Sequence, residues 1–236
     1  MAYWRTHNEY FIEAGEHRGV EVIGVGVHGP GALFLDRSID SLDDLDGKRV
    51  RIGGGVMADI SNALDLTGVA LPPAGTYEAA TQGVVDGAML TLEGLKSFRL
   101  AEVLPYTVQM PGGFYRGSFS LVINPDTWAS LSEEDREAIE SVSGERLSRL
   151  FGYMMDVVDV RGIEFAEERG NTFIELPAEE VERFQQMAAE LPGKWKAEAE
   201  RKGVDGEAAR AYFLEQLEAV GKEEGLSADE VIDPEA

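Results

Sequence analysis

The sequence of 236 residues contains no cysteine, which excludes disulfides, thiolate metal sites and thiol nucleophiles together. Long apolar runs are missing too, because stretches such as 20–27 and 84–92 have only the length of a strand. A membrane-spanning helix needs roughly 20 consecutive apolar residues. Residues 1–16 are polar and amphipathic, without the apolar segment of a secretory signal. We therefore expect neither a membrane span nor a signal peptide in this chain.

Positive charge is scarce, with 21 lysines and arginines against 44 acidic residues and a formal net charge of -23. Such a field repels phosphate backbones, and no basic stripe interrupts it, so nucleic acid is not an expected partner. The same field bears on small ligands. A small anion would have to be held by local hydrogen-bond donors, against the overall charge of the protein.

Histidine is scarce as well, because the sequence contains only His7, His17 and His28. A helix is predicted over 3–17, where His7 and His17 stand ten residues apart and do not share the i, i+4 face of a metal-binding pair. The H-E-x-x-H motif is absent. We interpret all three as structural histidines and expect no metal and no cofactor. A G-x-S-x-G elbow, which would support a serine nucleophile, is also absent.

Glycine, by contrast, is abundant, and residues 24–29 match the G-x-G-x-x-G string of dinucleotide-binding folds. That site requires a helix to begin directly at the glycine turn. Here Pro30 and Gly31 follow at once, and 32–35 again has the pattern of a strand. The sequence therefore favours a glycine-rich loop over a nucleotide site.

Strand-like and helix-like segments alternate through the first half of the chain, which indicates α/β lobes with parallel strand pairing. After Pro125 the pattern becomes helical, and Ser132 is typical of a helix start. The expected strands are 21–27, 32–35, 48–52, 69–71, 84–90 and 118–124, the last with buried faces. The expected helices are 3–17, 56–66, 76–82, 92–101, 126–169, 178–202 and 207–223. The acidic tail from Ala228 is expected to fray.

The most informative segment is the strand 48–52 and the three glycines after it, Gly53, Gly54 and Gly55. Arg49 and Arg51 share one face of this strand, and Arg51 lies at its carboxyl end, where α/β sheets usually bind ligands. The glycines expose backbone N–H groups at the start of the next helix, and a guanidinium offers two donors to a carboxylate. The segment is thus a candidate carboxylate clamp. A surface arginine paired with one of the many acids is an equal alternative.

Four segments in succession resemble one protein family. They are Ser41–Arg51 (SLDDLDGKRVR), Tyr77–Ala88 (YEAATQGVVDGA), Phe98–Tyr106 (FRLAEVLPY) and Ser120–Asn124 (SLVIN). Each is a weak match alone, but their order and spacing are similar to those of the DctP-type solute receptors of TRAP transporters. The resemblance begins to be specific at Ile39 and, with the C-terminal helices, covers nearly the whole chain.

The resemblance implies a periplasmic-binding-protein-like fold of two α/β lobes, type II-like, which closes on its ligand by a hinge motion. It implies that the chain is N-terminally truncated, because family members carry an opening portion and an export signal before the first helix. On this basis 1–35 would be the remainder of the first lobe. Residues 36–125 would form the second lobe with the crossing strands, and 126–236 a helical C-terminal region.

By the same resemblance the protein would capture a small organic acid and deliver it to membrane permease subunits in the periplasm or another extracytoplasmic space, without catalysis. Arg51 matches the family's ligand-binding arginine, and Gly55 falls near another pocket position. Pro73 and Leu90 replace an aromatic residue and an asparagine of other subgroups, which favours a less polar monocarboxylate such as an oxo, hydroxy or aromatic acid.

Two further residues are candidates for the pocket. Glu93 could accept a hydrogen bond from a ligand hydroxyl or stabilise a helix dipole, and Phe114 could shape the pocket or pack at the hinge. Two other functions stay open at this point. One is an α/β enzyme acting on a carboxylated metabolite, and the other is a truncated, non-functional remnant.

Overall fold

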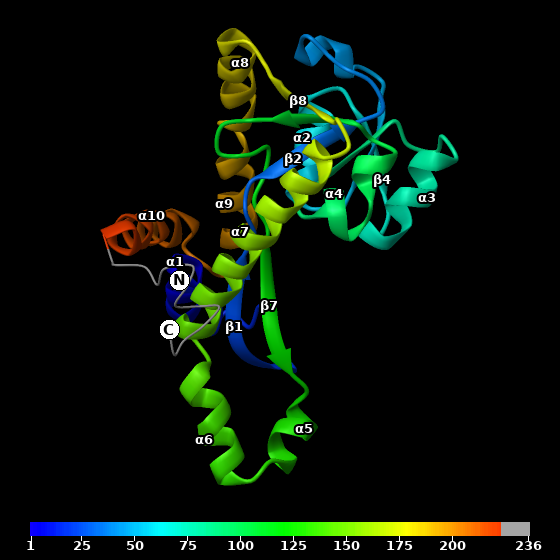
Figure 1. The fold of residues 1–236 in the computed structure, drawn as a ribbon. Coiled ribbons are helices and arrows are strands. Elements are labelled where there is room, and N and C mark those ends of the chain that lie inside the picture. Colours follow the sequence, from blue (N-terminus) through cyan, green and yellow to red (C-terminus); the bar gives the residue numbers. More distant parts are fainter. Residues whose placement is uncertain (223–236) are drawn as a thin grey trace. The chain divides into compact units, whose positions relative to one another are not determined.

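The computed structural model describes residues 1–222, which divide into two compact units (Figure 1). Unit 1 comprises 1–28, 117–154 and the chain from 193 onward, and unit 2 comprises 29–116 and 155–192. The chain thus passes from unit 1 to unit 2 and back twice. The division into 1–35, 36–125 and 126–236 drawn from the resemblance differs from these units and stays a prediction. The expectation for the tail from Ala228 lies outside the described residues.

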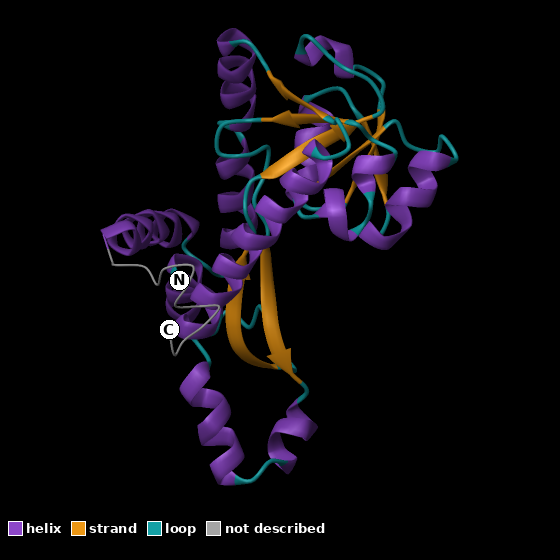
Figure 2. Ribbon diagram, in the orientation of Figure 1, coloured by secondary structure: helices purple, strands orange, loops and turns teal. Residues whose placement is uncertain are grey.

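Unit 2 is built on a six-stranded mixed sheet in the order β4-β3-β5-β2-β6-β8. Helices lie around these strands, which are orange in Figure 2. β3 pairs in parallel with β4 and β5, and β6 in parallel with β8, whereas β2 is antiparallel to both β5 and β6. The expectation of parallel pairing therefore holds for only some of the strand pairs in this sheet. The strands are β2 Gly31–Leu35, β3 Arg49–Ile52, β4 Thr67–Ala70, β5 Gly87–Thr91, β6 Tyr106–Gln109 and β8 Thr172–Glu175.

The core of unit 2 lies on both faces of this sheet. In β2, Leu33 and Leu35 belong to one buried apolar cluster, whereas Ala32 and Phe34 belong to a second. Alternate side chains of a strand point to opposite faces, so a strand covered on both sides is apolar throughout, as the sequence GALFL is. The helices of unit 2 are α2 Val56–Ala63, α3 Thr76–Thr81, α4 Gly94–Ser97 and α8 Ala178–Ala188.

Unit 1 has only a two-stranded antiparallel sheet, of β1 Glu21–Val27 and β7 Ser118–Ile123. Phe119 and Val122 of β7 are 50% and 45% exposed, so the expectation of a strand with buried faces is wrong here. The reason is that the described residues of unit 1 supply too few strands to cover both faces. Its helices are α1 Ala2–Thr6, α5 Pro125–Ser130, α6 Glu133–Val142 and α10 Gly206–Lys222, with most of α9 Leu191–Arg201.

The helix expected over 3–17 ends at Phe11. It consists of α1 and of the single-turn helix η1, His7–Phe11, which continues it. Turns follow, in which Gly15 and Gly19 have positive φ angles of 71° and 86°, a conformation that glycine adopts without steric cost. The chain folds back on itself, and Nε2 of His7 lies 2.9 Å from Nδ1 of His17. The expectation that their spacing keeps these two histidines apart is therefore wrong.

The helical segment expected over 126–169 is three helices, because α5 and α6 end at Ser130 and Val142 before α7, Glu145–Glu167, begins. The expected helix start at Ser132 is confirmed, since its Oγ accepts a hydrogen bond from the backbone N–H of Asp135 at 3.1 Å. The strand β8 was not expected. Within residues 1–222, no helix is long and apolar enough to cross a membrane.

Candidate functional site

Arg51 lies on β3, between β4 and β5 in the sheet of unit 2, and is only 3% exposed. Its Nε donates a hydrogen bond to the carbonyl oxygen of Leu71 at 2.9 Å, and its Nη1 donates to that of Met89 at 3.0 Å. Leu71 follows β4 and Met89 belongs to β5, so the two neighbouring strands hold the guanidinium in place. Burial lowers the pKa of Arg51, yet an arginine keeps its proton in proteins. A buried positive charge is therefore held by neutral carbonyl groups.

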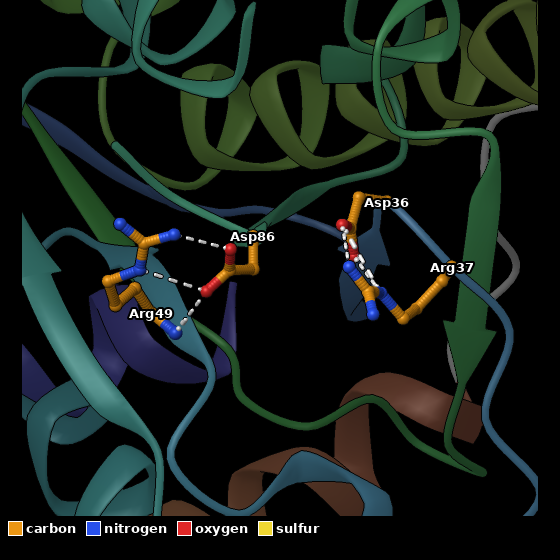
Figure 3. A network of polar contacts seen from close by, with 4 residues as sticks. All are labelled: Asp36, Arg37, Arg49 and Asp86. Carbon is orange, nitrogen blue, oxygen red and sulfur yellow. Dashed lines mark hydrogen bonds and ion pairs between the residues drawn. The ribbon is translucent and has the colours of Figure 1, made fainter. Parts of the chain in front are cut away.

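The surface ion pair that the sequence offered as an alternative belongs to Arg49 and not to Arg51. Arg49 makes a bidentate contact with Asp86, with distances of 3.0 Å from Nε to Oδ2 and 2.6 Å from Nη2 to Oδ1 (Figure 3). Asp86 also accepts the backbone N–H of Arg49 at 2.9 Å. The two arginines of β3 thus have different partners. Arg49 is at the start of the strand beside Asp86, whereas Arg51 is buried and bonds to backbone carbonyls.

One nitrogen of Arg51 differs from the other two in having no partner within the described residues. Nη2 makes no hydrogen bond to any residue in the described range, and it would lie 3.7 Å from a Cβ atom added to Gly53. Glycine at this position keeps side-chain atoms away from this nitrogen. The arrangement is suited to a carboxylate, which can accept a charge-assisted hydrogen bond from this nitrogen.

The three glycines form the turn between β3 and α2, as expected. Gly54 and Gly55 have φ angles of 92° and 57°, in a region that residues with side chains rarely adopt. The donors of this turn are partly engaged, because the N–H groups of Met57 and Ala58 bond to the carbonyls of Gly54 and Gly55. The turn therefore offers fewer donors to an anion than the glycine count suggests, and Arg51 carries the charge.

Arg51, Asp159 and Glu93 each lie near Tyr115. Burial raises the pKa of Tyr115 to about 12, the positive charge of Arg51 opposes this rise, and the charges of Asp159 and Glu93 add to it. The ring of Tyr115 packs directly on the backbone of Gly31, where an added Cβ would lie 2.2 Å from a ring carbon. Of the predicted residues, the structure therefore brings Arg51 and Glu93 together around Tyr115.

Asp159, on helix α7, is the residue of this site that the sequence did not indicate. It is 5% exposed, and its Oδ1 accepts the backbone N–H of Glu93 at 2.7 Å. Its Oδ2 is buried without a hydrogen-bond partner among the described residues. Burial is the main reason that its pKa rises to about 6. Among 44 acidic residues, no local pattern distinguishes the one that becomes buried.

The remaining predicted residues lie in different surroundings. Leu90 is 7% exposed and belongs to the same apolar cluster as Phe34, whereas Phe114 belongs to the opposite cluster and packs edge-on against Phe184 at 5.0 Å. Pro73 is half-buried at the start of a short 3₁₀ helix, η3 Pro73–Gly75. Their contact with a ligand stays a prediction.

A cavity of about 490 Å³ in unit 2 is lined by none of the predicted residues. It is lined by Pro30, Gly31, Ala32, Leu92, Gln109, Met110, Pro111, Glu175, Leu176 and Val181. The nucleotide alternative also has no support, because the segment after Gly29 enters strand β2 and not a helix.

Comparison with known proteins identifies the family. Residues 7–198 match the model of the bacterial extracellular solute-binding proteins, family 7, known as DctP. The chain is similar to TsaT of Comamonas testosteroni, described as an outer membrane transporter protein, with 30% identity over 224 residues. That match covers 93% of this chain and 65% of TsaT.

Two solved structures are also similar. One is a TRAP periplasmic solute-binding protein of Bordetella bronchiseptica with bound (R)- and (S)-mandelate, at 30% identity and a TM-score of 0.88. The other is a TRAP solute-binding protein of Rhodoferax ferrireducens T118 with copurified benzoate, at 25% identity and a TM-score of 0.85. Each match covers 93% of this chain and 70% of the other. The chain therefore has the two-lobe fold class of these receptors and belongs to family 7 of the bacterial extracellular solute-binding proteins, the DctP family.

Proposed function

We propose that this chain is the ligand-binding part of a TRAP-type receptor, which captures a small carboxylic acid and delivers it to membrane permease subunits from an extracytoplasmic space. The observation that carries the proposal is the state of Arg51. Its guanidinium is buried and fixed by two carbonyl groups, and Nη2 makes no hydrogen bond to the described residues. A protein that only binds and releases its ligand needs such a fixed donor and no reacting group.

The energetics favour an anionic ligand at this position. A buried charge without a charged partner is costly, and a carboxylate restores both the opposite charge and a hydrogen bond. Because the carbonyls of Leu71 and Met89 already fix the guanidinium, little side-chain entropy is lost when a ligand binds. Ligand binding therefore offsets part of the free energy that folding spends on burying the charge of Arg51.

Within this proposal, the ligand class is an aromatic monocarboxylate. Two similar structures contain mandelate and benzoate, and a third, at 25% identity, is a marine metagenome receptor in complex with 3-hydroxybenzoate. Tyr115 offers an aromatic ring beside Arg51, and the sequence has Leu90 where other subgroups have an asparagine. Glu93 would accept a hydrogen bond from a hydroxyl group on the ligand.

The test is a thermal-shift screen followed by calorimetric titration with benzoate, 3-hydroxybenzoate, mandelate and succinate. At a ligand concentration about a hundred times the dissociation constant, linkage predicts about 2.7 kcal/mol of stabilisation. We expect stabilisation by the aromatic acids and its loss in Arg51→Met. Arg49→Met is the matched control, because it removes a guanidinium from the same strand and should leave ligand binding intact.

Two results would contradict the proposal. If Arg51→Met bound the ligand with the wild-type affinity, Arg51 would not be part of the site. If succinate alone stabilised the chain, the ligand would not be an aromatic monocarboxylate. Circular dichroism of each variant without ligand shows whether the sheet still forms. Arg51→Lys adds a second check, because it keeps the charge but loses the planar pair of donors, and so should bind with reduced affinity.

A further inference from the structure

We propose that unit 1 contains a binding site for a divalent transition-metal ion, with zinc as the best-fitting ion, formed by His7, Glu16 and His17. One ligand atom from each of these residues lies within 4.8 Å of the other two. The site is separate from Arg51, which belongs to unit 2. It therefore concerns a property of the chain beyond the capture of an organic acid.

The arrangement of the two imidazoles is close to that of a metal-binding pair. Nε2 of His7 and Nδ1 of His17 point at each other at 2.9 Å, and the ring centroids are 4.9 Å apart. In tetrahedral zinc sites the bonds are about 2.0–2.1 Å, which separates ligand atoms by roughly 3.3 Å. An opening of a few tenths of an ångström between the two nitrogens would therefore admit an ion. The carboxylate of Glu16 lies in an exposed turn, where it can rotate to complete three ligands.

The surroundings hold the ring of His17 in the orientation that a metal requires and keep the ring of His7 packed in place. Nε2 of His17 lies 2.5 Å from Oγ of Ser120 on β7. When this nitrogen donates its proton to Ser120, Nδ1 presents its lone pair toward His7, as metal-binding histidines do through their second hydrogen bond. His7 is 1% exposed, with Trp4 stacked on it at 6.0 Å and Phe11 at its edge at 6.5 Å.

The donor types indicate which ion is preferred. Two imidazole nitrogens and one carboxylate form a donor set that zinc uses when a fourth position stays open to water. Calcium and magnesium prefer all-oxygen sites with more ligands, so they should not compete. Because His7 begins η1 and His17 lies in the turns that follow it, an ion would fasten this N-terminal segment on itself and, through Ser120, beside β7.

The experiment is a titration of the metal-stripped chain with zinc chloride, followed by calorimetry and by equilibrium dialysis, in a background of magnesium and calcium. We expect one tightly bound zinc ion per chain and a rise of the melting temperature. His17→Asn and Glu16→Gln should weaken zinc binding by about tenfold or more. Glu13→Gln, which changes another exposed acid of the same segment, should leave zinc binding unchanged.

With a net charge of -23, weak zinc binding to surface carboxylates must be separated from the site. Substitution with cobalt provides this separation, because tetrahedral coordination by imidazole nitrogens has a strong visible absorption that carboxylates alone do not produce. Equal zinc affinity in the wild type, His17→Asn and Glu16→Gln would overturn the proposal, as would zinc binding no tighter than that of calcium. Circular dichroism of both variants shows that they fold, so a loss of zinc binding is not mistaken for unfolding.

Discussion

The two units of this protein differ in how completely they bury their own sheet. Unit 2 covers both faces of six strands, and Leu33, Phe34 and Leu35 of β2 are each 0% exposed. Unit 1 has two strands, of which β7 leaves Phe119 and Val122 about half exposed. Sheets of two strands are marginally stable in water, whereas three or more strands with packed faces support themselves. The candidate ligand site belongs to the unit with the packed sheet.

This difference has a consequence for binding. In the proposed site, Arg51 serves as a donor only if Leu71 and Met89 stay in place, because a mobile guanidinium would lose entropy each time it bound a ligand. A sheet buried on both faces supplies this rigidity.

The largest expected effect comes from truncating one phenylalanine in each sheet. Phe34→Ala removes a fully buried ring from unit 2 and should lower the free energy of unfolding by about 3–5 kcal/mol. Phe119→Ala removes a half-exposed ring and should cost less than about 1 kcal/mol. Urea unfolding combined with hydrogen exchange, resolved by peptide, measures each unit. Equal losses in the two variants would break the comparison between the units.

A somewhat smaller effect tests whether the dry interior of unit 2 extends to Asp159. Its pKa is raised from 3.8 to about 6, so the folded state binds a proton more tightly than the unfolded state does. The resulting stability is present below about pH 4 and is lost as the pH rises through about 6, a change of about 3 kcal/mol. Asp159→Asn should remove this pH dependence and raise stability at neutral pH, measured by urea unfolding from pH 4 to 8.

Glu164→Gln is the control for Asp159→Asn, because it changes an exposed acid on the same helix α7. This variant should keep the wild-type dependence on pH. If Asp159→Asn also keeps it, the carboxyl group of Asp159 is solvated, and the site is more open than the structure indicates.

The smallest expected effect compares two ion pairs at the edge of unit 2 (Figure 3). Asp86→Ala should cost about 1–2 kcal/mol, because the half-buried Asp86 makes a bidentate contact with the side chain of Arg49 and also accepts its backbone N–H. Asp36→Ala should cost less than about 0.5 kcal/mol, because its partner Arg37 is 71% exposed. Thermal unfolding of the two variants measures the difference.

The pH dependence of Asp86→Ala shows whether its effect on stability comes from charge. Hydrogen bonds from Arg49 lower the pKa of Asp86, so its contribution is present above the ordinary pKa of an aspartate and is lost as the pH falls through the lowered value. The difference between Asp86→Ala and the wild type should therefore shrink in acid. An unchanged difference would assign the effect to packing and not to charge.

Local patterns in the sequence predicted those parts of the fold that depend on neighbouring residues. The strands at 21–27, 32–35 and 48–52 and the helix start at Ser132 were confirmed, because side-chain alternation and capping act within a few residues. The family resemblance was confirmed because it rests on several segments in order. The helix over 3–17 was wrong, because apolar spacing alone did not show that Gly15 and Gly19 would bend the chain.

The sequence by itself thus determined the β-strands around the candidate site, the glycine turn after β3 and the presence of Arg51 near the end of that strand. Only the tertiary structure decided that Arg51 is buried between two carbonyls, that Asp159 lies beside Glu93, and that His7 meets His17. Each of these depends on residues brought together by packing across turns or between distant segments. Contacts between distant segments determine the free energy of burying a charge. They also determine the distance between the two imidazoles, which neighbours in the chain do not.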